Sequence, residues 1–489
     1  MAGVGITLNK IFEKETLTGH IVGFGYSAVL TVAPMFVVIG AIIGSQWLLG
    51  YSGVDYASRE LFADTVLYMF IFAMLSIAPF NAVLSRYLSD IIFMEKYQDI
   101  MPCYYVGLLM NVCFGSCFSI PFFVHEHLVG LVPIYYVFTS YCGFVALILV
   151  FYSMLYLNIT KDFIKISVCF SVGMLCTVLL SLLFVRVLRL ELTYALLLAL
   201  VIGLVIIASL EIAIIQSYFR QNSREYRAVL GYFRQYWQLV CINFLYTLGL
   251  YIHNFVFWST DMHIIVVRSF VTMMSYDMAT CIAMFTNISA TIIIITRIEM
   301  HFHDRYKAYS EAVIGGRGHD IRIAKRRLFR QLAEELMNLV RLQFIITVIV
   351  FLMCEVLLPQ LGYGGSVMNI YPCLAAGYFI LFLMYSEILF LYYFNDLAGA
   401  MLTSAAFCLV TFAVSLYATG LSEIWYGMGV VAGSFVGFTI AYFRLRAMER
   451  NLDEHVFCSG SILKKGSGRK PPGKVFDRRR DKQKTEEGV

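Results

Sequence analysis

Long apolar runs, separated by short polar segments, make up most of the chain. A membrane-spanning helix needs roughly 20 mostly apolar residues in a row. By that criterion the sequence predicts about twelve spans, at residues 21–49, 61–83, 104–124, 132–156, 163–185, 192–214, 239–258, 276–295, 339–358, 367–394, 398–419 and 424–443. The predicted fold is therefore an all-α polytopic membrane protein.

The eighth span is the least regular of these segments. Its apolar stretch begins near Ile264, but Arg268 and Asp277 interrupt it. We therefore expect the early part to be an interfacial or re-entrant segment. Composition agrees with a membrane protein, because 60% of the residues are hydrophobic and only 14% are charged. An ordinary soluble domain has about a quarter charged residues.

The Lys and Arg residues predict the orientation, because cytoplasmic loops carry the excess of positive charge. If the N-terminus lies inside, 33 of the 37 Lys and Arg residues fall on the cytoplasmic side. The opposite side receives only Arg59, Arg186, Arg189 and Arg268. We therefore predict a multi-pass protein of a bacterial inner membrane with both termini in the cytoplasm.

The chain divides at a basic cytoplasmic linker, residues 216–238. Two six-helix lobes are predicted on either side of it, at residues 1–215 and 239–446, and the second contains a large cytoplasmic loop at residues 297–338. Two pseudo-equivalent lobes are a common plan among transporters. The tail at residues 447–489 is basic and its end lacks hydrophobic periodicity, so we expect it to be disordered and to contact anionic lipid.

Signatures of soluble enzymes are missing from the sequence. It contains no GxxxxGK[ST] phosphate loop, no GxSxG elbow and no HExxH zinc motif. Glu299, His301 and His303 lie close together, but three such residues at a helix end are more typical of a solvated surface than of a metal site. We predict no catalytic residue, no metal, no cofactor and no nucleic-acid partner.

Ionisable residues inside spans are costly and usually face a protein interior or a watery path. Asp64 is one such residue, and the substrate-pathway candidates are Arg86, Glu211, His253, Asn254, Glu355 and Glu387. We expect Glu211, Glu355 or Glu387 to face an inward cavity. Two ordinary alternatives remain: Arg86 could snorkel at a span end, and His253 could be a hydrogen-bonded core histidine.

Residues 320–341 combine apolar positions at helical spacing with five basic residues: Arg322, Lys325, Arg326, Arg327 and Arg330. This pattern predicts a basic amphipathic helix that lies on the inner leaflet or against a partner. Arg297 and Glu299, where the eighth span ends, join these five residues as candidates for a cytoplasmic gate or a docking surface. Capping or snorkelling at a span end is the alternative for Arg297 and Glu299, as it is for Asp396.

Six segments resemble one known family. They are MAGVGITLNKIF at the start, GYSAVLTVAP in the first span, SRYLSD at 85–90, YIHNFVFW at 251–258, RIEMHFHDRYKAYSEAV at 297–313 and YYFND at 392–396. In order and spacing they resemble the PelG family, the membrane transporters of Pel exopolysaccharide systems. This family is a branch of the multidrug/oligosaccharidyl-lipid/polysaccharide flippase superfamily, and the similarity extends from Met1 to about Arg450.

The resemblance implies a flippase-like fold and an inner-membrane exporter of a growing, galactosamine-rich polysaccharide for the biofilm matrix. It also implies a cytoplasmic Pel-type glycosyltransferase and other Pel membrane proteins as partners. Two alternatives stay open on the residues alone. One is an exporter of drugs or lipid-linked oligosaccharides from the same superfamily, and the other is a polytopic membrane acyltransferase that uses His253 as its base.

Overall fold

The structure is a computed structural model, and it describes residues 17–160, 163–261, 263–266, 270–284, 303–360 and 364–457. Several predictions fall outside these ranges. They concern Arg268, Arg297, Glu299 and His301, the second part of the eighth predicted span, and the tail from residue 458 onward.

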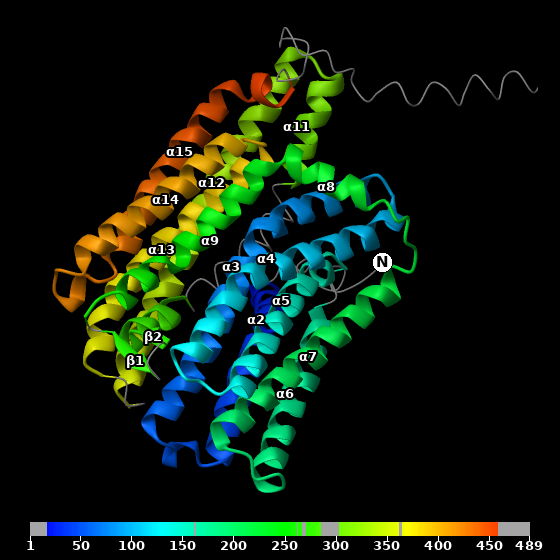
Figure 1. The fold of residues 1–489 in the computed structure, drawn as a ribbon. Helices are drawn as coiled ribbons and strands as arrows, with labels where there is room; N and C mark the ends of the chain where they lie inside the picture. Colours follow the sequence, from blue (N-terminus) through cyan, green and yellow to red (C-terminus); the bar gives the residue numbers. More distant parts are fainter. Residues whose placement is uncertain are drawn as a thin grey trace, which may run out of the picture.

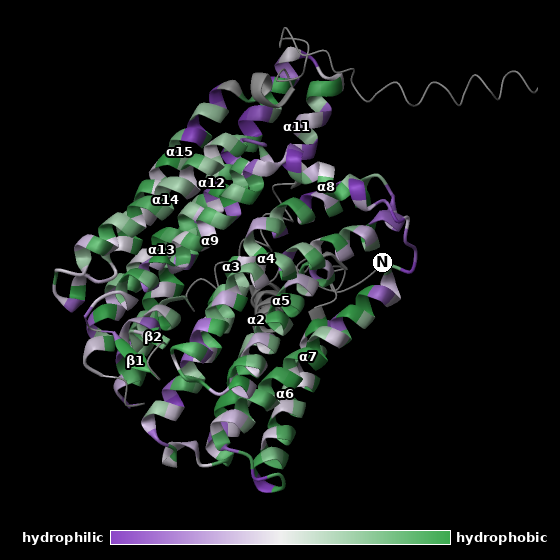
Figure 2. Cartoon of the chain, in the orientation of Figure 1, coloured by the Kyte–Doolittle hydropathy of each residue, from purple (hydrophilic) through white to green (hydrophobic). Residues whose placement is uncertain are grey.

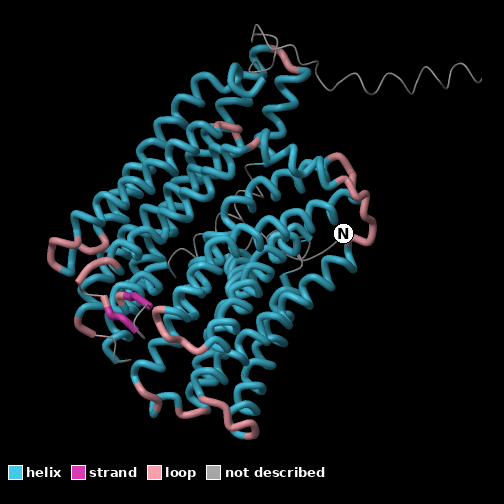
Figure 3. The backbone as a smooth tube through the Cα atoms, in the orientation of Figure 1, coloured by secondary structure: helices cyan, strands magenta, loops and turns pink. Residues whose placement is uncertain are grey.

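Helices account for nearly all of the described chain (Figure 3). The long helices are α2 (Leu17–Leu48), α3 (Tyr56–Phe93), α4 (Ile100–Leu128), α5 (Ile134–Thr160), α6 (Phe163–Arg186), α7 (Leu192–Tyr218), α9 (Trp237–Trp258), α12 (Gly318–Gln360), α13 (Ser366–Tyr393), α14 (Leu397–Ala418) and α15 (Met428–Phe457). Among the described residues, 10 helices are long and apolar enough to cross a membrane. The all-α polytopic prediction is therefore confirmed.

The helices form two bundles (Figure 1). In the N-terminal bundle, α2 packs on α6, α6 on α7, α7 on α5, and α3 on both α4 and α5. In the C-terminal bundle, α15 packs on α13 and α14, and α14 also packs on α9. Helix α8 (Tyr226–Gln235) precedes α9 in the segment that connects the bundles. The bundles meet where α3 of the first runs beside α9 of the second.

Hydrophilic residues gather at the two ends of the molecule, and the helices between them are mostly hydrophobic (Figure 2). One end carries α8, α11 (His303–Gly315) and the last turns of α15, and we call it the basic end. The opposite end carries an antiparallel hairpin of β1 (Ile264–Val266) and β2 (Phe270–Thr272), and we call it the hairpin end. The hairpin lies where the sequence predicts an interfacial or re-entrant segment, and a helix over residues 274–284 follows it.

Glycines allow some helices to approach closely. A Cβ added at Gly203 on α7 would lie 2.8 Å from the Gly173 carbonyl oxygen on α6. On α15, a Cβ at Gly433 would lie 2.9 Å from the backbone of Phe407 and of Thr411 on α14. Small residues favour such contacts in membranes, where helices gain little from the hydrophobic effect and depend on close packing. These two glycines therefore bring α7 close to α6 and α15 close to α14.

Helix α12 differs from the prediction of a separate amphipathic helix on the membrane surface. It is one helix of 43 residues that contains both the basic segment and the ninth predicted span. Its apolar stripe is buried within the chain, with Leu328 and Leu332 in the core and Phe329 stacked 5.6 Å from Phe394 at the end of α13. Because that stripe is covered by the chain, it is not free to enter the inner leaflet, and contact of the basic face with lipid or a partner stays a prediction.

Candidate functional site

The boundary between the two bundles is an aromatic seam along α3 and α9. Tyr68 stacks on Trp258 with ring centroids 4.9 Å apart. One turn further along α3, Phe72 stacks on Phe255 at 5.9 Å and an interplanar angle of 10°. Offset and edge-on aromatic pairs each add about 0.5–1.5 kcal/mol beyond their buried area. The α3–α9 seam therefore holds the bundles together along one side.

At the basic end, Arg86 on α3 makes contacts across the boundary. Its Nη1 donates to the side-chain oxygen of Asn395 at 3.0 Å, and its guanidinium lies 4.3 Å from the Tyr236 ring centroid. Asp90, one turn along α3, accepts a hydrogen bond from the Tyr232 hydroxyl on α8. Burial, together with the Asp90 carboxylate, raises the pKa of Tyr232, so its phenol stays a donor. We call these interactions the basic-end contact.

The loop that presents Asn395 is held by an ion pair. Asp396 is buried and accepts from Arg444 on α15 at 2.7 and 2.9 Å. It also caps α14 by accepting from the Gly399 N–H at 3.0 Å, which is the capping role offered as an alternative for this residue. Asn395 itself has φ of 57°, a left-handed conformation that asparagine tolerates better than most residues. The fixed Asp396 therefore sets the position from which Asn395 reaches Arg86.

At the hairpin end, α3 contacts the edge of strand β2. The Tyr68 hydroxyl donates to the Val271 carbonyl at 2.5 Å and accepts from the Val271 N–H at 3.2 Å. Asp277 orients the stacking partner of Tyr68, because both of its oxygens accept from the Trp258 indole N–H, at 3.0 and 2.9 Å. We call the interactions of Tyr68 with β2 and Trp258 the hairpin-end contact.

His253 and Asn254 lie inside the C-terminal bundle and are almost fully buried. The His253 Nδ1 is 2.8 Å from the Tyr276 hydroxyl, and the Asn254 amide donates to Asp277 at 2.6 Å. Both residues thus connect α9 to the helix over residues 274–284. Both residues therefore brace α9 beside the seam. A cavity of about 370 Å³ lies between the two bundles, and neither His253 nor Asn254 lines it.

The three glutamates predicted to face an inward cavity occupy different environments. Glu211 on α7 is 0% exposed, and neither of its oxygens has a hydrogen-bond partner among the described residues. Glu387 on α13 is 2% exposed, and its Oε2 also lacks a described partner. Glu355 instead lies on the exposed face of α12, between the exposed Leu352 and Val356. Glu355 therefore differs from the two buried glutamates in its surroundings, and the inward position stays a prediction for all three residues.

The five basic residues of α12 form a surface at the basic end. Arg322, Arg326, Arg327 and Arg330 are exposed, and Lys325 is half-buried. With Arg305 of α11, Arg327 and Arg330 border a polar hollow of about 430 Å³. Arg330 pairs with Glu334 at 2.9 Å within the helix, and Lys325 donates to the Arg450 carbonyl at 3.2 Å. The charge of this surface is therefore neutralised only in part.

Sequence reasoning missed three residues that join the two bundles: Tyr68, Trp258 and Asn395. A signal was present for two of them, since Trp258 ends the YIHNFVFW segment and Asn395 lies in YYFND. Asp277 was noted only as an interruption of a span. Among the described residues, no three His, Cys, Asp or Glu side chains are grouped so as to hold a metal ion.

Solved structures with a similar fold are transporters. An outward-facing multidrug-resistance MATE transporter of the MOP superfamily aligns with a TM-score of 0.58 at 14% identity, over 88% of this chain and 96% of that one. The Vibrio cholerae MATE transporter VcmN in its bent form gives 0.57 at 11% identity, over 88% and 97%. A MOP superfamily transporter from Pyrococcus furiosus gives 0.56 at 13% identity, over 86% and 96%. At these identities the likeness concerns the fold alone.

A search of curated protein sequences gave no match. Residues 1–457, by contrast, match one protein family, PelG, whose description is "Putative exopolysaccharide Exporter (EPS-E)". That match extends over both bundles and includes the segments that form the basic-end and hairpin-end contacts. The chain belongs to the PelG family of exopolysaccharide exporters.

Proposed function

We propose that this protein moves a growing exopolysaccharide across a bacterial inner membrane, along the boundary between its two helix bundles. The observation that carries the proposal is the family match over residues 1–457, since it includes every described helix. The MATE-like arrangement of two bundles supports it, because a boundary between two bundles can open to either side in turn. In this proposal residues 1–215 and 239–446 are the two moving lobes.

The basic-end and hairpin-end contacts are the proposed gates. Each joins the N-terminal bundle to the C-terminal one through a few polar bonds: Arg86 to Asn395 at one end, and Tyr68 to Val271 at the other. The polymer can enter at the basic end only when the basic-end contact is broken, and it can leave at the hairpin end only when the hairpin-end contact is broken. Arg86 therefore acts as a gate residue, while His253 and Asn254 keep α9 rigid between the two gates.

The basic end is the cytoplasmic face in this proposal, and both termini lie there. The excess of Lys and Arg in the loops of that side supports this orientation. The exposed basic face of α12 then projects into the cytoplasm. There it is suited to an acidic surface on the glycosyltransferase that delivers the polymer, and to the anionic lipid beside it.

Charge reversal tests this docking surface. Changing Arg326 and Arg327 to Glu should reduce polymer secretion and co-purification of the glycosyltransferase, while the amount of protein in the membrane stays unchanged. Reversal of Arg220 and Arg227, two exposed arginines of the linker, changes the charge by the same amount and is the matched control. Unchanged co-purification in the α12 variant would exclude docking at this face.

The proposed substrate is a Pel-like, galactosamine-rich polymer, as the family implies. In a strain that lacks this protein, isolated membranes that contain the glycosyltransferase should still synthesise the polymer, but the cells should secrete none. Expression of the wild-type chain should restore secretion. The alternative, a drug or lipid-linked oligosaccharide exporter, predicts altered drug susceptibility or cell-envelope defects with normal polymer secretion. Normal secretion in the deletion strain would refute the proposal.

We also propose that the protein is a transporter without catalytic activity. The acyltransferase alternative requires His253 to reach an acyl donor, yet its ring is 0% exposed and its neighbours are Tyr276 and Tyr378. Polymer acetylation that disappears in a His253→Leu variant and persists in a gate variant of Arg86 would favour the enzyme instead.

A further inference from the structure

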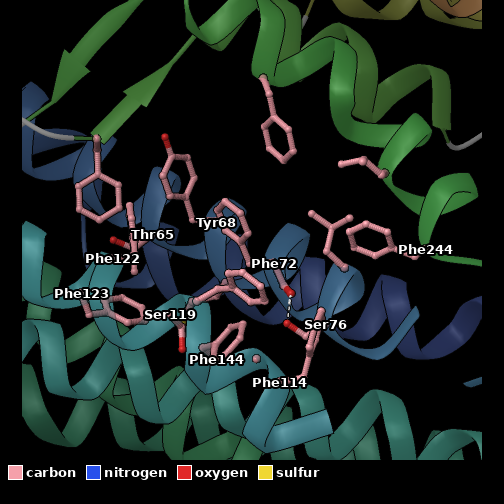
Figure 4. A pocket seen from close by; sticks show the side chains of 17 residues that line it. Thr65, Tyr68, Phe72, Ser76, Phe114, Ser119, Phe122, Phe123, Phe144 and Phe244 are labelled. Carbon is pink, nitrogen blue, oxygen red and sulfur yellow. Dashed lines mark hydrogen bonds between the residues drawn. The ribbon is translucent and has the colours of Figure 1, made fainter. Parts of the chain in front are cut away.

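A cavity of about 370 Å³ lies between the two bundles, within the membrane-spanning part of the molecule (Figure 4). Helices α3, α4 and α5 form the wall on the N-terminal side, and α9 and strand β2 form the opposite wall. Leu75 and Phe114 lie on the first wall, and Phe244, Leu248 and Phe270 lie on the second. An occupant would therefore touch both bundles at once.

Aromatic side chains make up more than half of the lining. Nine of the 17 lining residues are phenylalanines, and none of the described lining residues carries a charge. Phe72 and Phe255, which stack across the seam, both belong to this wall. Such a surface offers contacts to hydrocarbon and little to a polar molecule.

The hydroxyl groups in the wall are largely used within the protein. Thr65 donates to the Leu61 carbonyl of its own helix at 2.6 Å, and Ser76 donates to the Phe72 carbonyl at 2.7 Å. A sugar ring placed here would lose hydrogen bonds to water, and it would find too few protein groups to replace them. An unmade hydrogen bond costs about 1–3 kcal/mol for each buried polar group. The polymer is therefore a poor occupant for this cavity while the seam is closed, and it can pass along the boundary only after the bundles have moved apart.

On the α4 side, one residue of the cavity lining is exposed on the surface of a candidate membrane span. Phe118 lines the cavity, and it is also 65% exposed near the middle of a candidate membrane span. Leu109, which comes before Phe118 on the same helix, is 63% exposed and lies outside the cavity. At this depth the surrounding medium is hydrocarbon. A lipid chain can therefore reach the cavity sideways, past Phe118.

We propose that this cavity binds an acyl chain of a membrane phospholipid, which enters between α4 and α9. The hydrophobic effect contributes little, because the chain leaves a hydrocarbon environment to enter another. Binding depends instead on dispersion contacts with the phenylalanine walls, which an empty cavity would forgo. Because both bundles contribute walls, the bound chain stabilises the closed seam, and opening of the seam releases it.

Photo-crosslinking tests this site on the full-length protein. The protein is reconstituted in vesicles of phosphatidylethanolamine and phosphatidylglycerol that contain a phospholipid with a diazirine in its acyl chain. After irradiation, mass spectrometry locates the label. We expect the label on residues 114–123 of α4 and, across the seam, on residues 244–255 of α9.

Filling the cavity should remove the label from α9. Ser119→Trp fills it from α4, where the replaced hydroxyl has no hydrogen-bond partner in the described structure, and Leu248→Trp fills it from α9. Each should lower labelling of α9 about tenfold, the factor that corresponds to ~1.4 kcal/mol of binding free energy. Leu109→Trp adds the same bulk on the lipid-facing surface outside the cavity and should leave that labelling unchanged.

Two results would overturn the proposal. One is wild-type label confined to the outer surface around Leu109, without label on α9. The other is equal labelling of α9 in the filled variants and the control. Gel filtration shows which variants fold, and the position of the label in the wild-type protein decides the question even if both filled variants fail to fold. Because the assay contains no polymer, its outcome is independent of the export function.

Discussion

The Arg86–Asn395 bond should hold the basic-end gate closed, and its contribution can be worked out from the geometry. The bond is charge-assisted and 3.0 Å long, but Asn395 is exposed, so solvent screening lowers its contribution from the usual ~1.5–3 kcal/mol to about 1 kcal/mol. The guanidinium 4.3 Å from the Tyr236 ring centroid adds about 0.5–1 kcal/mol at a partly exposed site. Arg86→Ala removes both interactions. The ratio of open to closed gate should then rise about tenfold to thirtyfold, since 1.4 kcal/mol is a factor of ten.

Distances between spin labels measure this ratio. Ser89 on α3 and Ala398 on α14 are exposed at the basic end on opposite sides of the boundary. Each is replaced by a labelled cysteine in a protein without its 12 native cysteines, reconstituted in nanodiscs. Asn395→Ala should open the gate less than Arg86→Ala, because it leaves the Tyr236 contact in place. The double variant should open it no further than Arg86→Ala, since the two residues share one bond.

Arg86→Lys is the matched control for charge. Lysine retains the positive charge but lacks the planar fork that can bond Asn395 while covering the Tyr236 ring, so the gate should open to an intermediate degree. Distance distributions that are the same in the wild type, Arg86→Ala and Asn395→Ala would refute a gate at this contact. Strictly additive effects of the two alanine substitutions would show that the residues are not coupled.

Three further predictions follow from the packing. Gly433→Leu should reduce thermal stability in detergent by the equivalent of about 1–3 kcal/mol, because the leucine side chain would meet the backbone of α14. Gly420→Ala is the control and should leave thermal stability unchanged, because the nearest contact of the added Cβ would be at 3.7 Å. Asp277→Ala removes both acceptor oxygens, so it should release the Trp258 indole and shift its fluorescence to longer wavelength, with about 1–2 kcal/mol lost; an unchanged spectrum would contradict the bracing role. Polymer secretion should survive His253→Gln, because glutamine keeps hydrogen bonding, and should be lost in His253→Leu with a normal amount of protein in the membrane. Normal secretion in both variants would show that His253 only packs.

The membrane spans, their order and the charge asymmetry of the loops could all be predicted from the sequence. A span is a local property, since about 20 apolar residues form a helix in lipid wherever they occur. The described spans agree with the predicted ranges within a few residues at most ends, and the largest differences are at helix ends in the polar loops, as in α3, α12 and α15. The basic residues of α12 were also evident from their spacing, although the helix proved to be longer than the predicted one.

Only the tertiary structure decided the basic-end contact, the hairpin-end contact, the seam and the cavity. Arg86 and Asn395 are 309 positions apart, so no local pattern relates them. Hydropathy also cannot tell an apolar residue that faces lipid from one that faces a neighbouring helix, because both environments are apolar. For that reason Glu355 and Glu387 looked alike in sequence, yet one is exposed on α12 and the other is buried on α13. Which apolar faces meet depends on how the helices pack, and that packing placed an aromatic cavity between two bundles whose sequences predicted only spans.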